Sequence, residues 1–339
     1  MKEYNIAIAG VTGAVGNVFL SILEERNMPV KDLIPLASSR SAGKRIRFKG
    51  EEFEVKELKK DSFKNTDIAL FSAGASRSAE FAPHAVESGA TVIDNSSAFR
   101  MDEQVPLVVP EVNPDDVKKH KGIIANPNCS TTIMVVALKP VYDLSRIKRV
   151  VVSTYQAVSG AGSKGIVELQ QQIEKIINKK DTEIVNEIFP RQIAYNVIPH
   201  IDVFLDNGYT KEEMKMTDET RKIMGDENIM ITATTVRVPV LTSHSESINI
   251  ETEEKLTVEE CMKALKNAPG ITLKDDFKNK IYPTTLDTSG RDNIFVGRVR
   301  EDISCPKGIC MWVVGDQLRK GAALNAIQIA ELLGTYNLV

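Results

Sequence analysis

The chain has 339 residues, a length that favours two domains over one ordinary core. With 42% hydrophobic residues, 26% charged residues and a net charge of −3, the composition is that of a soluble globular protein, and no basic excess indicates nucleic acid or an anionic membrane. Four cysteines are too few for a disulfide framework, and the sequence contains no signal-peptide pattern and no apolar run of membrane-spanning length. We therefore expect a cytoplasmic protein without nucleic-acid or membrane partners.

The first 125 residues alternate short apolar runs with helical patterns. Residues 4–10 have the character of a buried strand; glycines follow at once, and then apolar residues at helical spacing from Val15 to Leu23. The further elements expected in this part are strands at 33–37, 67–72, 91–93, 107–109 and 123–125, and a helix over 77–88. This alternation predicts a doubly wound, Rossmann-type α/β domain with a parallel sheet.

After residue 126 the expected strands become longer, and several alternate apolar and polar residues. They cover 148–157, 229–240, 244–252, 295–301 and 309–314, with helices at 166–177 and after the capping box Thr257-Val-Glu-Glu260. The pattern predicts an α+β domain with a mostly antiparallel sheet and one open face. Because its apolar positions exceed what the helices can cover, we expect that face to form a subunit interface.

Two further stretches complete the domain prediction. The polar stretch 206–227 is expected to be a surface excursion, and a final helix over about 322–335 is expected to return to the first domain. The predicted domains are therefore 1–128 plus 319–339, which would bind a dinucleotide, and 129–318, which would carry catalysis and dimerisation.

A glycine motif joins the first expected strand to the first expected helix. In Gly10-Val-Thr-Gly13-Ala-Val-Gly16, glycines would allow the backbone to approach a pyrophosphate at the helix N-terminus, although a plain tight turn would look similar. The second expected strand ends in Ser38-Ser-Arg40-Ser41, without the acidic residue that usually binds the ribose of NAD. Arginine and serine suit the 2′-phosphate of NADP, and the alternative is a solvated loop.

Cys129 follows Asn126-Pro-Asn and precedes Ser-Thr-Thr and an apolar helix. Amides at a helix N-terminus stabilise a thiolate, so this cysteine is a candidate nucleophile for carbonyl and acyl carbons; the alternative is a buried structural cysteine.

His244 lies seven residues after Arg237, and the two could form one site in which Arg237 clamps a carboxylate while His244 moves protons. A surface histidine is the alternative for His244. Cys305 and Cys310 have no partner ligands, so no metal site is expected.

Taken together, these motifs resemble those of the aspartate-semialdehyde dehydrogenase family. The resemblance runs nearly from end to end and rests on seven motifs in one order. These are GxxGxxG at Gly10, Ser-Arg-Ser-Ala-Gly at Ser39, Asn-Pro-Asn-Cys-Ser-Thr at Asn126, Gln156-Ala-Val-Ser-Gly160, Glu212-Glu-Met-Lys215, Arg237-Val-Pro-Val and His244, with Gly315-Asp-Gln317 beyond them.

The resemblance implies a reaction and a role for each matching residue. The enzyme would reduce L-aspartyl 4-phosphate with NADPH through a thioester on Cys129, releasing phosphate and L-aspartate 4-semialdehyde for amino-acid biosynthesis. His244 would be the acid/base, Gln156 would orient the acyl group and Arg237 would hold the α-carboxylate. The remaining implied residues are Arg100, Asn128, Glu212 and Lys215 for substrate and phosphate, and Gly10, Thr12, Gly13, Ala14, Val15, Arg40, Ser41, Ser159, Gly160 and Gln317 for NADP(H).

The same resemblance implies a homodimer or a dimer of dimers. One alternative is N-acetyl-γ-glutamyl-phosphate reductase, which also uses a cysteine and NADPH but acts on a substrate with an acylated amine, and so should not need the same polar pocket. Another is a non-catalytic paralogue that keeps the dinucleotide fold as an interaction module. The sequence around Cys129 and Gln156 favours the aspartate enzyme, and the joint presence of Cys129, Gln156, Arg237 and His244 weighs against the paralogue.

Overall fold

The computed structural model describes residues 2–178 and 184–339 and divides the chain into two compact units. Unit 1 comprises Met1–Cys129 and Gly321–Val339, and unit 2 comprises Ser130–Lys320. The last helix thus belongs to the same unit as the N-terminal sheet. Within the described ranges, no helix is long and apolar enough to cross a membrane.

Unit 1 is built on a six-stranded parallel sheet in the order β5-β2-β1-β6-β7-β8. Its strands are β1 (Tyr4–Ala9), β2 (Val30–Ala37), β5 (Lys56–Glu57), β6 (Ile68–Phe71), β7 (Thr91–Asp94) and β8 (Ile123–Ala125). Its helices are α1 (Ala14–Glu25), α2 (Ala75–Glu87) and α8 (Leu324–Thr335), with short turns η1 (Ser39–Ser41) and η2 (Pro114–Lys119) and a separate hairpin of β3 (Arg45–Phe48) and β4 (Glu51–Glu54).

The central strand β1 is buried on both faces. Ile6 and Ile8 pack into a core shared with α1 and α8, whereas Ala7 and Ala9 pack into a second core that includes residues of α2. This two-sided burial explains the continuous apolar run in the sequence and confirms the predicted doubly wound α/β fold. The strand predicted at 107–109 was wrong: Leu107 forms only an isolated bridge with Ala125.

Unit 2 is built on a six-stranded mixed sheet in the order β10-β9-β11-β14-β13-β12. The strands are β9 (Ile147–Gln156), β10 (Met230–Arg237), β11 (His244–Thr252), β12 (Ile271–Leu273), β13 (Ile294–Glu301) and β14 (Gly308–Gly315). The helices are α3 (Cys129–Tyr142), which begins at the division between the units, α4 (Ser163–Ile177), α5 (Lys211–Met224), α6 (Val258–Asn267) and α7 (Thr285–Thr288), with η3 (Val158–Ala161) and the π-helical η4 (Arg319–Ala323). Pairs β9–β10 and β12–β13 are parallel, while the three central pairs are antiparallel, as predicted for most of this sheet.

The stretch 206–227 is not the surface excursion that its polarity predicted. It contains α5, whose N-cap Thr210 and third helical residue Glu213 form a capping box. Glu213 also accepts a hydrogen bond from the Thr235 backbone amide at 2.9 Å, which ties the helix to β10. The polar residues therefore cap the helix and form hydrogen bonds to a neighbouring strand. The average polarity of the stretch was misleading because it predicted a surface segment.

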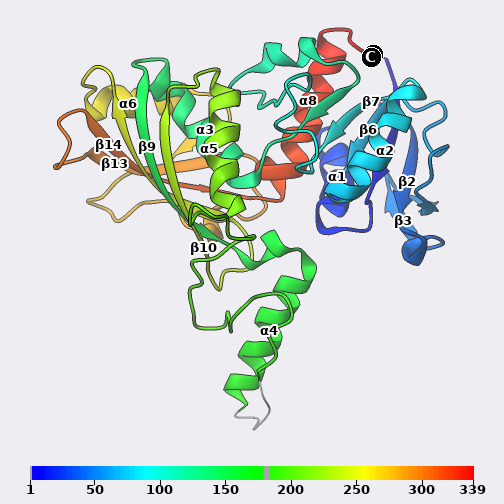
Figure 1. Cartoon of the computed structure of the whole chain (residues 1–339), viewed down its shortest axis with the longest axis horizontal. Helices are drawn as coiled ribbons and strands as arrows, with labels where there is room; N and C mark the ends of the chain where they lie inside the picture. Colours follow the sequence, from blue (N-terminus) through cyan, green and yellow to red (C-terminus); the bar gives the residue numbers. More distant parts are fainter. Residues whose placement is uncertain (1, 179–183) are drawn as a thin grey trace. The chain divides into compact units, whose positions relative to one another are not determined.

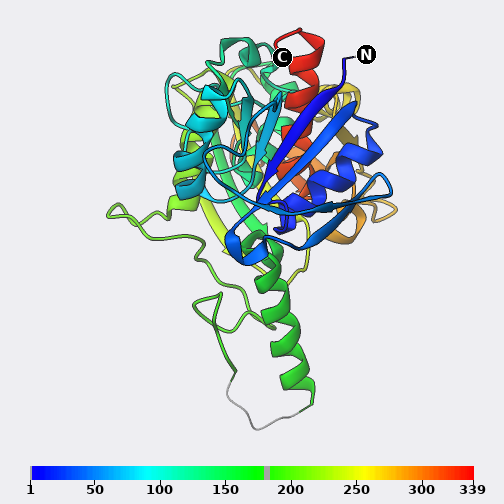
Figure 2. The same cartoon turned by 90° about the vertical axis from the view of Figure 1, so that its right-hand side faces the viewer.

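Helix α4 extends away from the sheet of unit 2, as both views show (Figure 1 and Figure 2). Its apolar stripe has a small core of its own, in which Leu169 packs with Phe189, Ile193 and Ile198 from the chain that returns toward the sheet. Glu168 on the same helix accepts backbone hydrogen bonds from residues 187 and 188 of that returning chain. The returning chain is thereby fixed where it passes the end of β10.

The covered face of the unit 2 sheet contains one unusual residue, Glu246 on β11. Its side chain is fully buried, and neither carboxylate oxygen has a hydrogen-bond partner among the residues that the structure describes. Burial raises the pKa of Glu246 well above its ordinary value and so favours the neutral carboxyl group in the folded protein.

The burial of Glu246 predicts that the free energy of unfolding depends on pH. In the unfolded chain Glu246 ionises above about pH 4.3, so the folded state binds more protons and stability falls as the pH rises toward the folded-state pKa. Glu246→Gln removes the ionisation and should raise the melting temperature more at pH 8 than at pH 5. The matched control is Glu251→Gln, on the same strand but only partly buried. For this variant the change in melting temperature should be the same at pH 8 and at pH 5. Equal increments for Glu246→Gln would contradict the assignment.

Candidate active site

One edge of the unit 2 sheet gathers four of the residues singled out in the sequence. The parallel strands β9 and β10 end together, with Gln156 paired to Arg237 in register. Strand β11 runs antiparallel to β9 and begins at this edge with His244, and β14 ends there two residues before Gln317. Residues separated by up to 161 positions therefore meet because of strand direction and register.

Arg237 is almost fully buried at this edge. Its Nη1 donates to the Ala157 carbonyl at 2.6 Å, and its guanidinium lies over the ring of Phe189, with Cζ 5.9 Å from the centroid. The backbone of Arg237 pairs with that of Ile198 in both directions. A guanidinium fixed in this way is preorganised to bind a carboxylate.

His244 is completely buried, and one hydrogen bond identifies which of its ring nitrogens carries the proton. The Ala157 backbone N–H donates to Nδ1 at 3.1 Å, so in the neutral ring the proton is on Nε2. Burial, followed by the charge of Arg237, lowers the pKa of His244 well below its ordinary value. No hydrogen-bond partner for Nε2 lies within residues 2–178 and 184–339, which makes Nε2–H an available proton donor.

The Gln317 side chain connects two loops at this edge through hydrogen bonds. Its side-chain oxygen accepts from the Ser243 amide at 2.8 Å, and its side-chain nitrogen donates to the Ser159 hydroxyl. Ser243 has φ +69°, a strained value for a serine, immediately before His244. Ser243 was not among the residues singled out in the sequence, and its backbone is held in this conformation by the hydrogen bond to Gln317.

Gly160, in η3, lies against the side chains of both Arg237 and His244. A Cβ at this position would approach Arg237 Nη1 to 2.8 Å and His244 Nε2 to 3.3 Å. The absence of a side chain at Gly160 therefore leaves the space that Arg237 and His244 occupy. The resemblance implied a cofactor role for this glycine, and the local geometry adds this steric one.

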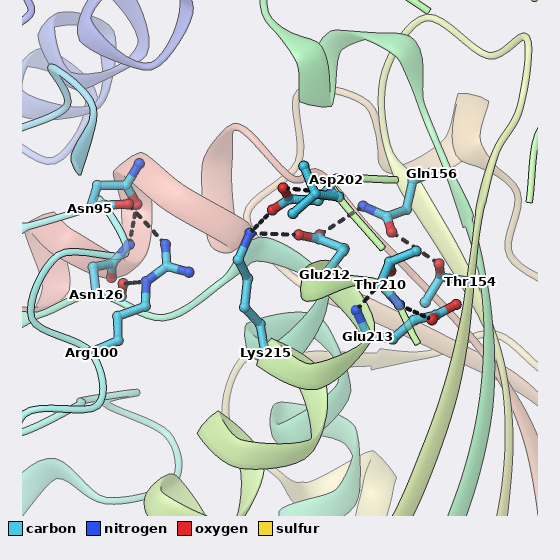
Figure 3. A network of polar contacts seen from close by, with 11 residues as sticks. Asn95, Arg100, Asn126, Thr154, Gln156, Asp202, Thr210, Glu212, Glu213 and Lys215 are labelled. Carbon is cyan, nitrogen blue, oxygen red and sulfur yellow. Dashed lines mark hydrogen bonds and ion pairs between the residues drawn. The ribbon is translucent and has the colours of Figure 1, made fainter. Parts of the chain in front are cut away.

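A second group of polar side chains surrounds the N-terminus of α5 (Figure 3). Gln156 donates to Glu212 at 3.3 Å and receives a hydrogen bond from Thr154 at 3.0 Å. Lys215, one turn further, contacts Glu212 at 3.1 Å and Asp202 at 2.7 Å. Of these, Asp202 and Thr154 were missed in the sequence because neither belongs to a recognisable motif.

In unit 1, Arg100 and Asn126 belong to a separate buried network (Figure 3). Arg100 donates through Nε to the Asn126 carbonyl and through Nη2 to the Asn95 carbonyl, both at 2.9 Å. The Asn126 amide is fixed in turn by Asn95 and Asn325. This network shapes the turn that continues through the nearly buried Asn128 to Cys129.

Cys129 is the first residue of α3 and is partly exposed. Its helix has no acidic residue in the first turn, which suits a thiolate at this end of the helix. Gly321 lies directly beside it: a Cβ there would be 2.9 Å from the Cys129 Cβ. Cys261, by contrast, is fully buried in α6.

The glycine motif has the backbone that a dinucleotide turn requires. Gly10 has φ +91°, and a Cβ there would lie 2.3 Å from the Ser72 carbonyl oxygen; a Cβ at Gly16 would lie 2.3 Å from the Gly10 oxygen. Helix α1 starts after Gly13 with no side-chain cap and no acidic first-turn residue. Thr12, Ala14 and Val15 lie in or beside this turn, and Arg40 and Ser41 lie in η1 at the end of β2. The residues present fit a phosphate-bearing cofactor.

The steric role of Gly160 is testable with one methyl group. Gly160→Ala should fold, because its φ is not positive, but it should displace Arg237 and raise the KM for the carboxylate substrate about tenfold or more. The KM for the dinucleotide should change little. Gly13→Ala, at the tip of the glycine turn, should give the opposite pattern. A Gly160→Ala variant that loses only dinucleotide binding would contradict this interpretation.

Two family models match the chain, one over most of each unit. Residues 5–120 match the family model of the semialdehyde dehydrogenase NAD-binding domain, and residues 138–320 match that of the semialdehyde dehydrogenase dimerisation domain. The aspartate-semialdehyde dehydrogenase of Aquifex aeolicus is 59% identical over 99% of both chains, and that of Bacillus subtilis is 52% identical over 100% of this chain and 99% of its own.

Solved structures agree. The Vibrio cholerae aspartate semialdehyde dehydrogenase II complexed with ASA superposes with a TM-score of 0.96 at 50% identity, covering 99% of each chain. The Candida albicans enzyme with NADP gives 0.77 at 26% identity, covering 100% of each. The chain belongs to the aspartate-semialdehyde dehydrogenase family.

Proposed function

We propose that this protein is an NADP-dependent aspartate-semialdehyde dehydrogenase that reductively dephosphorylates L-aspartyl 4-phosphate. The observation that carries the proposal is the strand edge at which Arg237, His244 and Gln156 meet. A buried guanidinium, a neutral imidazole with a proton on Nε2 and a side-chain amide form a site for a small carboxylate whose reacting group exchanges protons. Relatives that are 50–59% identical over nearly the whole chain carry this name.

The two units supply different parts of the proposed chemistry. The Cys129 thiolate attacks the acyl carbon of the substrate; the C–S bond forms, the C–O bond to phosphate breaks, and the electron pair leaves with the phosphate. NADPH, when bound, supplies the hydride that reduces the thioester to the level of the aldehyde. His244 donates a proton to the developing oxyanion and takes it back as the C–S bond breaks, which releases the aldehyde and regenerates the Cys129 thiolate.

Other residues bind the charged groups of the substrate in this proposal. Arg237 holds the α-carboxylate, and Gln156 orients the acyl group. Arg100, Asn128 and Lys215 bind the phosphate, with Glu212 beside Lys215. The buried carbonyl contacts of Arg100 and Arg237 support these roles, because both guanidinium groups are held in place before any ligand binds.

We also propose a homodimer formed through unit 2, in the cytoplasm. The sheet face opposite His244 and Glu246 is only partly covered and carries Tyr155 in contact with Trp312. The match to a dimerisation domain supports this assembly. The reducing compartment is supported by the four free cysteines.

Turnover with two acyl phosphates tests the function. NADPH oxidation should be rapid with L-aspartyl 4-phosphate and negligible with N-acetyl-γ-glutamyl phosphate. Cys129→Ser should keep NADPH binding but lose turnover, because the serine hydroxyl is far less acidic than the thiol. Preference for the glutamyl substrate would establish the alternative reductase, and no turnover with either substrate would favour a non-catalytic paralogue.

Cofactor preference depends in this proposal on Arg40, in η1 at the end of β2. Its guanidinium and the hydroxyls of Ser39 or Ser41 would bind the 2′-phosphate of NADPH, and each charge-assisted hydrogen bond contributes about 1.5–3 kcal/mol. Arg40→Ala should therefore raise the KM for NADPH roughly tenfold or more and leave the KM for NADH nearly unchanged. Equal losses with both cofactors would remove Arg40 from the site.

A further inference from the structure

Lys215 is the cation to which the proposed function assigns phosphate, yet two carboxylates already contact its ammonium group. Asp202 Oδ2 lies 2.7 Å from Nζ, and Glu212 Oε2 lies 3.1 Å away (Figure 3). Burial alone would lower the pKa of Lys215, but the two carboxylates outweigh it and raise the pKa. The lysine is therefore fully charged, and two of its three N–H donors point toward carboxylates.

An anion that approaches Lys215 meets the negative charge of Asp202 at the same ammonium group. Lys215, Glu212 and Asp202 together carry one positive and two negative charges, which is an unfavourable set of neighbours for a phosphate. Either the phosphate does not use Lys215, or one carboxylate gives way to it.

The two carboxylates differ in how easily they could give way. The Glu212 side chain is only 8% exposed, and it also accepts from Gln156 within the site. The Asp202 side chain is 31% exposed and lies in a segment before α5, outside any helix or strand. A partly exposed ion pair contributes little free energy, so a doubly charged phosphate can compete with it.

Asp202 is also held in an uncommon backbone conformation. Its φ is +67°, in the left-handed region, and its Oδ1 accepts a hydrogen bond from the next backbone amide, that of Val203, at 2.9 Å. Asparagine and aspartate tolerate this conformation better than other non-glycine residues do. The segment thus presents a carboxylate to Lys215 at a cost in backbone energy, which points to a role for that carboxylate.

This inference rests on the proposed function. We propose that Asp202 is a displaceable counter-ion of Lys215: its carboxylate holds the Lys215 ammonium group in place until phosphate displaces the carboxylate. Asp202 would then set the affinity for phosphate, the leaving group of the reductive reaction and a substrate of the reverse reaction. Weak phosphate binding favours product release, so the carboxylate acts as a positioning residue that also limits retention of the product.

Steady-state kinetics in the reverse direction, with aspartate semialdehyde, NADP⁺ and varied inorganic phosphate, test this proposal. Asp202→Asn keeps the shape and the tolerated φ but removes the charge, so the KM for phosphate should fall about three- to tenfold. The KM for NADP⁺ should not change. The matched control is Asp206→Asn, an exposed aspartate four residues later, which should leave the KM for phosphate within about twofold.

Two further results separate the counter-ion role from its alternatives. If Asp202 only orders Lys215, Asp202→Asn will raise the KM for phosphate, and the proposal is overturned. Lys215→Ala tests the proposed function by itself and should raise that KM strongly. If Lys215→Ala raises the KM and Asp202→Asn leaves it unchanged, the phosphate site stands and the counter-ion role fails. If neither variant changes the KM, Lys215 does not bind phosphate and both assignments fail.

Discussion

The register between β9 and β10 is the constraint on which the candidate site depends. Because these strands are parallel and pair Gln156 with Arg237, both side chains reach the same edge of the sheet. The antiparallel β11 then begins there with His244, and the backbone of Ala157 donates to His244 Nδ1 through its N–H and accepts from Arg237 Nη1 through its carbonyl. A shift of one residue in the β9–β10 pairing would turn Gln156 or Arg237 to the opposite face and separate these groups.

Burial and charge then tune the groups that the edge brings together. His244 and Arg237 are both nearly or fully inaccessible, and the proximity of a fixed cation helps to keep the imidazole neutral. At the neighbouring N-terminus of α5 the opposite balance holds, because carboxylates keep Lys215 charged. The site therefore combines a neutral proton donor with fixed cations, an arrangement suited to a substrate with several negative groups.

The sequence predicted the elements that repeat a simple pattern and the residues that belong to motifs. Five strands of unit 1 (β1, β2, β6, β7 and β8), the capping box at Thr257 and the candidates Cys129, Arg237 and His244 could be identified in this way, whereas the short strands β3, β4 and β5 were missed. Helix α5 was missed because the polarity of its stretch dominated the prediction, although Thr210 and Glu213 have capping-box spacing. Asp202 and Ser243 could not be predicted, since their roles depend on left-handed backbone and on contacts distant in sequence.

The central claim of the proposed function is that Cys129 carries the acyl group as a thioester. The most direct measurement is peptide mapping by mass spectrometry. The enzyme is incubated with aspartate semialdehyde and NADP⁺ and then quenched; without phosphate in the incubation, the thioester cannot be released by phosphate. The account predicts an aspartyl adduct on the peptide that contains Cys129 and its loss when phosphate is added before the quench. An adduct on Cys261, Cys305 or Cys310, or no adduct on any cysteine, would contradict it.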